Sequence, residues 1–230
     1  MDISIIIPAC NEEENIPKLI EYLNNHSDEK VKEVILIDGG SSDNTLHLAA
    51  AAGVKAIVSP QKGRAAQMNY GASLATGNIF YFVHADTFPP ASFVKDISNA
   101  VKQGYDFGRY KSKFLSKKPL LWLNEWFTAL DLFICMGGDQ TLFIKKDWFK
   151  KLNGFRSDML IMEEYEFCKR ARDAGARYKI MKGSALISAR KYDKNSWLQV
   201  QLANYRIVKM YKKGDSQQSM VDQYKKMLNL

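Results

Sequence analysis

Residues 79–86 read Ile-Phe-Tyr-Phe-Val-His-Ala-Asp, in which five hydrophobic residues in a row are followed by His84 and Asp86. A short run rich in β-branched and aromatic residues is typical of a strand buried on both faces. Thr-Phe-Pro-Pro at residues 87–90 ends that strand, because proline cannot donate to a β-ladder. Open α/β sheets bind ligands at the carboxyl ends of their strands, so Asp86 is placed where a carboxylate can hold a divalent cation on a diphosphate. The alternative is that Asp86 only opens the turn before the prolines.

The composition describes a folded chain with a basic surface. The 230 residues are 46% hydrophobic with a mean hydropathy of −0.30, and the formal net charge is +8 with a pI of about 9.2. Such a charge favours anionic partners, among them nucleotides and acidic lipid surfaces. Since no nucleic-acid reader motif accompanies the charge, we expect no nucleic-acid partner.

The cysteines and the chain start indicate a reducing compartment. The three cysteines share no Cys-x-x-Cys spacing: Cys10, Cys135 and Cys168. Residues 1–4 lack the basic region of a signal peptide. The aromatic stretch at residues 120–136 contains charged residues and falls short of the ~20 apolar residues of a membrane-spanning helix. We therefore expect a cytoplasmic protein.

Three more hydrophobic runs lie upstream of the central strand, and each is followed by a segment with helical character. The expected strands are residues 3–7, 34–37 and 56–59. This alternation of strands and helices predicts a parallel sheet with right-handed crossovers. The loops after the strands then meet at one edge of the sheet, which brings residues 9–11, Asp38 and Asp86 together.

Local signals set the expected turns. We expect the first helix to begin at Asn11, because Glu14 lies at capping-box spacing from it. The core face of that helix follows at helical spacing: Ile16, Leu19, Ile20 and Leu23. After Asp38, the sequence Gly-Gly-Ser-Ser-Asp allows a tight turn and a serine cap on the next helix.

In the second half of the chain, strands and helices are not expected to alternate as regularly as in the first half. We expect a helix over residues 92–103, strands over 107–114 and 141–144, and a helix from Glu163 to Ala174. From Ser188 onward there are nine Lys or Arg residues against three Asp, with Trp197 and leucines among them. Such a tail is usually a solvated surface, and the alternative is an interfacial helix on a membrane.

Taken together, the motifs resemble the family 2 glycosyltransferases, which are inverting enzymes with the GT-A fold. The resemblance covers residues 1 to about 175, and the matching pieces appear in the family's order: Ile5-Ile6-Ile7-Pro8-Ala9-Cys10-Asn11-Glu12, Asp38-Gly39-Gly40-Ser41-Ser42-Asp43-Asn44-Thr45, Gly63-Arg64, His84-Ala85-Asp86 and Glu163-Glu164. The His-Ala-Asp variant with a later Gly-Asp-Gln looks like a bacterial subgroup of small single-domain transferases.

The resemblance implies a Rossmann-like, mostly parallel sheet flanked by helices and followed by a helical C-terminal tail. We expect a GT-A domain over residues 1–190, with a nucleotide-binding half at about 1–90 and an acceptor half at about 91–190. A basic amphipathic helical tail over residues 191–230 would follow.

The resemblance also implies a role for each matching residue. Asp38 would accept a hydrogen bond from the nucleotide base, and Arg64 would lie beside that base. Asp86 would coordinate Mg²⁺ or Mn²⁺ on the diphosphate, and Glu164 would be the general base on the acceptor hydroxyl. The other predicted contacts are Pro8, Ala9, Asn11, Glu12, Gly39 and Ala85 on the nucleotide, and Gly138, Asp139 and Gln140 on the acceptor.

The sequence departs from the family pattern in two places. His84 replaces the first acid of the metal motif, so the predicted ligands are Asp86 and His84 in a weaker site that relies more on water. The base position holds Glu instead of Asp, which leaves the choice between Glu163 and Glu164 open. The Gln-x-x-Arg-Trp motif of processive members is absent from the sequence, so polymer synthesis is not expected.

These observations predict an inverting glycosyltransferase that uses a UDP- or GDP-sugar. Its acceptor would be a small hydroxyl compound or a lipid at the inner face of the membrane, which the basic tail would contact. One alternative is a non-catalytic nucleotide or anionic-surface binder, supported by His84. Another is a sugar-phosphate nucleotidyltransferase, although the first loop lacks the glycines such enzymes use. Taken singly, Asp38 is more often a turn cap, Glu163 and Glu164 first-turn acids, and His84 a packed residue.

Overall fold

The computed structural model describes residues 1–116, 118, 120–135 and 141–229. Within these residues, eight strands form one sheet in the order β3-β2-β1-β4-β7-β6-β8-β5. The strands are β1 Ile3–Ala9, β2 Val31–Asp38, β3 Lys55–Val58, β4 Ile79–Phe82, β5 Thr87–Phe88, β6 Phe107–Phe114, β7 Leu142–Lys145 and β8 Tyr178–Ile187. The α-helices are α1 Ile16–His26, α2 Thr45–Ala51, α3 Arg64–Leu74, α4 Phe93–Lys102, α5 Leu121–Thr128, α6 Lys146–Lys151, α7 Glu163–Asp173, α8 Trp197–Lys213 and α9 Gln217–Met227, and the 3₁₀ turns are η1 Phe133–Cys135 and η2 Arg190–Tyr192.

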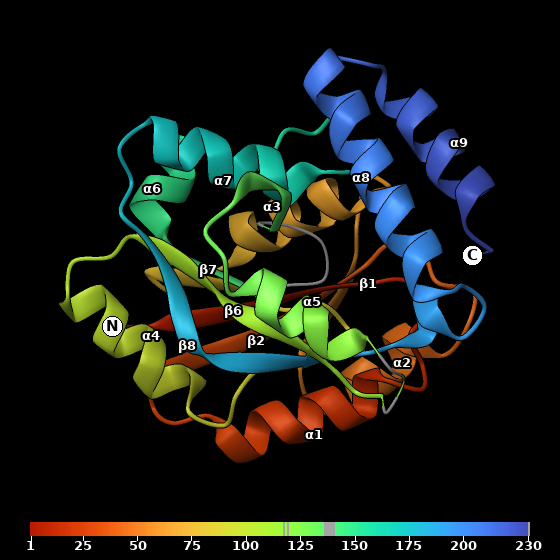
Figure 1. Ribbon diagram of the computed structural model, residues 1–230. Helices are drawn as coiled ribbons and strands as arrows, with labels where there is room; N and C mark the ends of the chain where they lie inside the picture. Colours follow the sequence, from red (N-terminus) through yellow and green to blue (C-terminus); the bar gives the residue numbers. More distant parts are fainter. Residues whose placement is uncertain (117, 119, 136–140, 230) are drawn as a thin grey trace.

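The N-terminal half confirms the predicted parallel sheet. β1 pairs in parallel with both β2 and β4, and β2 pairs in parallel with β3. The register places Ala9 opposite Asp38, so the ends of β1 and β2 lie at the same edge. Figure 1 shows these strands running through the centre of the molecule between helices. The topology therefore brings the loops after β1, β2 and β4 together.

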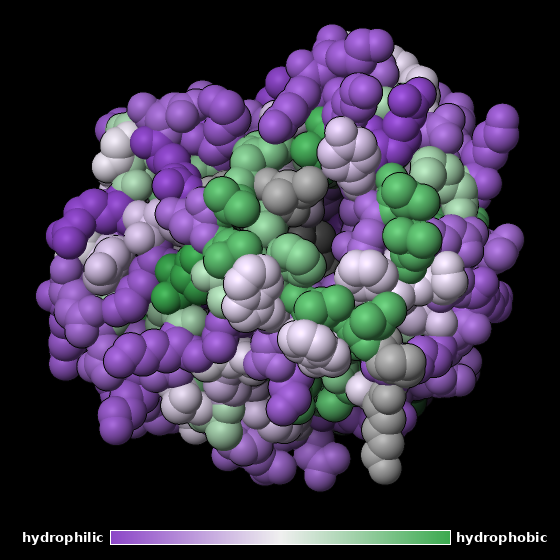
Figure 2. All heavy atoms as spheres, viewed as in Figure 1, coloured by the Kyte–Doolittle hydropathy of each residue, from purple (hydrophilic) through white to green (hydrophobic). Residues whose placement is uncertain are grey.

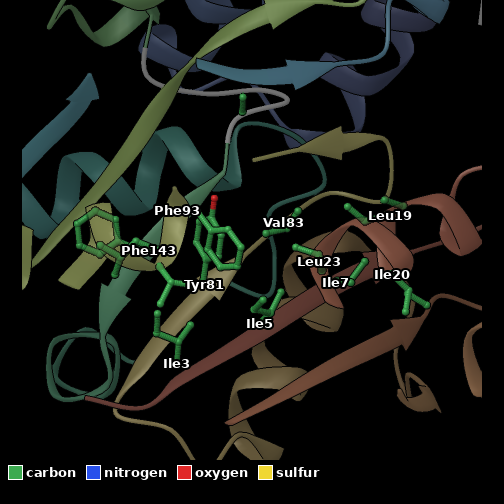
Figure 3. Close-up of a cluster of buried hydrophobic side chains, with 14 of the residues drawn as sticks. Ile3, Ile5, Ile7, Leu19, Ile20, Leu23, Tyr81, Val83, Phe93 and Phe143 are labelled. Atoms are coloured by element: carbon green, nitrogen blue, oxygen red, sulfur yellow. The ribbon is translucent and has the colours of Figure 1, made fainter. Parts of the chain in front are cut away.

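Two hydrophobic clusters cover the two faces of the sheet. One face packs against α1 and α4, and the other against α3, α6 and α7. The α1 residues predicted for the core are all buried, and burial of each such side chain contributes about 1.5–3 kcal/mol. Figure 3 shows side chains of the first cluster spread along the strands, from the α1 residues at one end to the Phe93 and Tyr81 rings at the other: Ile3, Ile5, Ile7, Leu19, Ile20, Leu23, Tyr81, Val83, Phe93 and Phe143.

The start of α1 differs from the prediction. The helix begins at Ile16, and its N-cap, Asn15, makes no capping side-chain bond. Asn11 adopts a left-handed backbone conformation with φ of 54°, so it cannot be a helical cap residue of the expected kind. The capping-box prediction is wrong because the amides of residues 11–13 bond to the loop after β2.

The second half of the sheet is of mixed direction. β7 is antiparallel to β4 and β6, whereas β6 and β8 are parallel. Residues 87–88, predicted to end the central strand, instead form β5 and pair antiparallel with β8. Sequence reasoning did not predict β8, although this strand closes the far side of the sheet and leads directly into η2.

The C-terminal helices pack on the domain. α8 and α9 share two small hydrophobic clusters with α5, η2 and the segment before α7. Figure 1 shows the two helices side by side beyond α7 and α5. Ser196 and Ser216 cap them, and Gly214 supplies the left-handed residue between them. None of the helices in the described part of the chain combines the length and hydrophobicity needed to span a bilayer.

Candidate functional site

The loops after β1 and β2 are joined by hydrogen bonds into one unit. The Gly39 amide donates to the Ala9 carbonyl at 2.8 Å. The Asn11 amide donates to Ser41 Oγ at 2.9 Å, and Asn11 Oδ1 accepts from the Ser42 amide at 2.8 Å. These reciprocal bonds fix one loop against the other, so both motifs that carry the family resemblance share a rigid backbone.

Asp38 is buried at the base of this unit. Its Oδ2 accepts from the amides of Gly40 and Ser41 at 3.0 and 2.9 Å, and its Oδ1 accepts from the Ser41 hydroxyl. Gly40 takes the positive φ of 93° that the turn needs. The turn-capping alternative therefore describes what Asp38 does within this chain, and its contact with a nucleotide base stays a prediction.

Gln67 on α3 forms hydrogen bonds to both β1 and β2. Its buried Nε2 donates to the carbonyls of Ala9 and Ile37, both at 2.8 Å. A Cβ on Gly39 would lie 3.0 Å from Gln67 Nε2, so the loop passes close to this side chain. Sequence reasoning missed Gln67, because a glutamine in an alanine-rich helix carries no local signal of such a role.

A cavity of about 260 Å³ opens between the end of β1, the start of α3 and the segment after β4. Its lining residues include most of the predicted nucleotide contacts and the His-Ala-Asp motif: Pro8, Ala9, Cys10, Glu12, Arg64, Gln67, His84, Ala85 and Asp86. We call it the strand-end cavity. The segments after β1 and β4 therefore meet at one cavity as predicted. Asn11, Asp38 and Gly39 do not line it and lie in the adjoining loop unit, so a shared site for Asp38 and Asp86 stays a prediction.

Two buried carboxylates in the first turn of α7 contact residues that line this cavity. Glu164 Oε1 lies 2.9 Å from His84 Nε2, and Glu163 Oε1 lies 2.7 Å from Arg64 Nε. Both glutamates are at most 5% exposed. The helix begins after Met162, whose left-handed backbone turns the chain into the site. His84 thus contacts the proposed base position, and its role as a metal ligand stays a prediction.

Arg190 on η2, directly after β8, contacts two acids that line the strand-end cavity. Its Nη2 lies 2.7 Å from Glu12 Oε1 and 3.0 Å from Asp86 Oδ2. The hydrogen bond to Glu12, more than that to Asp86, raises the pKa of the guanidinium, so it stays charged. The sequence had shown Arg190 only as part of a basic segment.

The described side chains do not form a ready divalent-metal site. Asp86 and Glu12 converge, but both contact a guanidinium, and one ring nitrogen of His84 faces Glu164. Among the described residues there is no group of three His, Cys, Asp or Glu side chains able to hold a metal ion. While Asp86 contacts Arg190 and His84 contacts Glu164, these residues do not form the predicted Mg²⁺ or Mn²⁺ site.

A second cavity of about 360 Å³ lies between α5, α7, α8 and α9. Arg64 lines it as well as the strand-end cavity, so the two spaces adjoin at this side chain. We call it the helix-lined cavity. Both charged and aromatic residues border it, including Phe127, Glu163, Glu164, Tyr192, Gln201 and Tyr224. The predicted acceptor residues Gly138, Asp139 and Gln140 lie outside the described residues.

A sheet whose strand-end loops enclose a cavity with acidic and basic groups beside a second cavity is the arrangement of a nucleotide-sugar transferase of the GT-A class. The family model for glycosyl transferase family 2 matches residues 4–134. This chain belongs to glycosyl transferase family 2, and the predicted family and fold class are confirmed.

Similar proteins extend the comparison. Glucosyl-3-phosphoglycerate synthase of Mycolicibacterium smegmatis is 33% identical over 96 residues, which are 38% of this chain and 32% of that protein. The match therefore spans about a third of the relative's length. S. aureus TarS 1-349 in complex with UDP-GlcNAc superposes with a TM-score of 0.68 at 18% identity, over 83% of this chain and 59% of that one. Glucosyl-3-phosphoglycerate synthase from Mycobacterium tuberculosis, in complex with Mn²⁺, UDP and phosphoglyceric acid, gives 0.66 at 20% identity, over 93% and 79%. At these identities the structures show a shared fold.

Proposed function

We propose that this protein transfers a sugar from a UDP-sugar to a hydroxyl acceptor with inversion at the anomeric carbon. The observation that carries the proposal is the meeting of the two cavities at Arg64, with Glu163 and Glu164 at the junction. One cavity lies at the strand ends, where α/β sheets bind nucleotides, and the other is open to an acceptor. UDP as the donor nucleotide is supported by the UDP and UDP-GlcNAc in the similar structures.

In this proposal the donor lies in the strand-end cavity. The joined loops after β1 and β2 would hold the nucleoside, and Asp38 and Arg64 would contact its nucleobase. The diphosphate would lie over Ala85 and Asp86, near the guanidinium of Arg190. The loop unit costs little to order on binding, because its amides are already engaged in hydrogen bonds within the chain.

Glu164 is the proposed general base. An acceptor hydroxyl in the helix-lined cavity attacks the anomeric carbon, its proton passes to the Glu164 carboxylate, and the C–O bond to the diphosphate breaks with its electron pair leaving on the diphosphate. His84 lies 2.9 Å from Glu164 and orients it. Glu163 is held by Arg64, which makes it the less suitable base.

The predicted Mg²⁺ or Mn²⁺ stays a prediction for this chain. Its support is the presence of Mn²⁺ or Mg²⁺ with UDP in the glucosyl-3-phosphoglycerate synthase structures. A bound cation would stabilise negative charge on the departing diphosphate. Asp86 would be its protein ligand, and it could serve only after separating from Arg190.

We further propose that the acceptor is presented at a membrane surface. Large hydrophobic side chains are exposed on α5 and α8, beside the helix-lined cavity: Trp122, Trp126, Phe127, Leu198, Leu202 and Tyr205. Figure 2 shows hydrophobic residues gathered on this face with hydrophilic residues around them, and Lys194, Arg206 and Lys209 are exposed on or next to α8. Aromatic rings combined with Lys and Arg are typical of protein faces that lie on anionic lipid. We call these six exposed residues of α5 and α8 the aromatic face.

Two assays test the donor proposal. We expect UDP and UDP-sugars to raise the melting temperature more than GDP does, since a ligand that binds only the folded state stabilises it. We also expect slow release of free sugar from the matching UDP-sugar, followed by chromatography. Nucleotide binding without any release would support the non-catalytic binder, and formation of a nucleotide-sugar from sugar 1-phosphate and a nucleoside triphosphate would support the nucleotidyltransferase.

A further inference from the structure

Arg190 occupies a fixed position between two acids that lie far from it in the sequence. Its segment is attached to the segment of Asp86 by a backbone bond, in which the Ser188 amide donates to the Asp86 carbonyl at 3.1 Å. β5 and β8 continue this pairing with Thr87 opposite Ile187. The backbone pairing of β5 with β8 therefore places Arg190 beside Asp86, so the contact does not depend on the side chains alone.

The two acids are themselves held in place. Glu12 Oε2 accepts from Asn15 Nδ2 at 2.6 Å, and the Glu12 amide donates to Thr45 Oγ1 at 2.7 Å. Asp86 follows the buried strand β4 and is partly buried. A single guanidinium nitrogen thus bridges two anchored carboxylates that both line the strand-end cavity.

A guanidinium in this place suits a diphosphate. It carries five N–H donors in a planar fork that matches phosphate oxygens, and both contacts seen here use Nη2 alone. When a diphosphate enters the strand-end cavity, its oxygens can bind the same fork from the opposite side. The bridged carboxylates would then hold the fork against the ligand.

We propose that Arg190 is the cationic partner of the donor diphosphate and competes with a divalent cation for Asp86. This inference rests on the proposed function. It assigns charge neutralisation at the diphosphate to a side chain of this chain, so nucleotide diphosphate binding does not require a metal. It also makes Arg190 a residue that distinguishes UDP from uridine, because only the phosphates reach it.

The first test is calorimetric titration of UDP and uridine in the presence of EDTA. The proteins are the wild type, Arg190→Gln, Arg190→Lys and the control Lys194→Gln, which removes an equal charge from an exposed position four residues away. We expect Arg190→Gln to lower UDP affinity at least about ten-fold and leave uridine affinity unchanged, because a charge-assisted bond is lost. Arg190→Lys should recover part of the loss, and Lys194→Gln should bind UDP like the wild type.

The second test measures Mn²⁺ binding without nucleotide by electron paramagnetic resonance. The wild type should bind Mn²⁺ weakly, because Arg190 engages Glu12 and Asp86. Arg190→Gln should bind it at least several-fold more tightly, since two oxygen ligands are released. This readout does not depend on enzymatic turnover.

The outcomes separate the inference from the proposed function. Equal UDP affinity in the wild type and Arg190→Gln, with unchanged Mn²⁺ binding, would overturn the inference while leaving UDP binding intact. Failure of the wild type to bind UDP with or without Mn²⁺ would instead overturn the proposed function. If Arg190→Gln does not fold, Arg190→Lys decides: weaker binding of UDP than by the wild type with unchanged uridine binding supports the inference, and wild-type UDP affinity contradicts it.

Discussion

The two sides of the candidate site are held in place by different interactions. One side is made of the loops after β1 and β2, and the other of the segments around α7 and η2. On the loop side, main-chain amides bond to side chains about one supersecondary unit away, as Asn11 does with Ser41 and Ser42. On the other side, the contacts are between side chains far apart in the sequence. His84 and Glu164 are separated by 80 positions, and Glu12 and Arg190 by 178. The loop side is fixed by its backbone, and the other side by ion pairs that a substrate can replace.

This difference assigns different tasks to the two sides. A loop held by main-chain bonds keeps its shape when the ligand leaves, which suits recognition of a constant nucleotide. Side-chain ion pairs can exchange one partner for a charged substrate, which suits the steps in which charge moves. Substitutions on the loop side should therefore affect stability and binding, whereas those on the ion-pair side should affect turnover.

The largest expected effect is on the ion-pair side. Glu164→Gln should fold normally and lose at least about 10²-fold in turnover, because an amide cannot accept the acceptor proton. Steady-state kinetics with the UDP-sugar identified by hydrolysis would measure it. Asp173→Asn at the exposed end of the same helix is the matched control and should keep its turnover. Full activity of Glu164→Gln would remove this residue from the role of base.

Glu163 offers a second test of the same side. Because Arg64 engages its carboxylate, Glu163→Gln should reduce turnover less than Glu164→Gln does. A larger loss for Glu163→Gln would exchange the two assignments. Comparing kcat with KM for the pair separates proton transfer from donor binding, the step proposed for Arg64.

On the loop side, Gln67→Leu should lower the free energy of unfolding by about 1–3 kcal/mol, because the carbonyls of Ala9 and Ile37 each lose a buried hydrogen bond. Urea denaturation measures the change, with Gln61→Leu, an exposed position, as the control. Turnover at saturating donor should fall much less than with Glu164→Gln. A stable Gln67→Leu protein would mean that the loops hold their shape without this residue.

The aromatic face yields a smaller effect. Replacing Trp122 and Trp126 together by serine should weaken sedimentation with vesicles of phosphatidylglycerol and phosphatidylcholine roughly ten-fold, since two exposed rings no longer enter the interface. Binding of UDP should not change. Equal sedimentation of the wild type and the double variant would contradict membrane contact through this face.

The smallest effect concerns acid stability of the mixed half of the sheet. Partial burial opposes ionisation of Asp106, but hydrogen bonds from Lys145 and the Arg177 amide lower its pKa overall. Its contribution is fully present above the unfolded pKa of about 3.9 and is lost as the pH falls through the lower folded value. Asp106→Asn should therefore lose less stability than the wild type between pH 6 and pH 3 in urea titrations. Identical pH dependence would show that the Lys145 pair contributes nothing.

The part of the fold that the sequence predicted is the part encoded by local patterns. The strands before Ala9, Asp38 and Asp86 are short hydrophobic runs, and parallel pairing then forces their ends together. Asn11 was misassigned because its long-range bonds to Ser41 and Ser42 outweigh a capping box that the local spacing suggested. β8 was missed because Lys-Gly-Ser interrupts its apolar pattern.

The candidate site divides in the same way. Motif residues in three loops were predicted to meet: those after β1 and β4 line the strand-end cavity together, whereas the Asp38 loop is bonded to the β1 loop outside this lining. Gln67 and Arg190 could not be found, because their partners are a main-chain carbonyl and acids up to 178 residues away. Such contacts depend on the folded sheet, and no spacing in the sequence indicates them. The roles of Glu163, Glu164 and His84 stay predictions.

The direct test is a crystal structure of the protein grown with UDP. The uracil should lie beside Asp38 and Arg64, with the diphosphate over Ala85 and Asp86 and within hydrogen-bonding distance of Arg190. UDP bound at another surface, or a strand-end cavity empty at a UDP concentration that saturates the protein in solution, would contradict the assignment of this cavity to the donor.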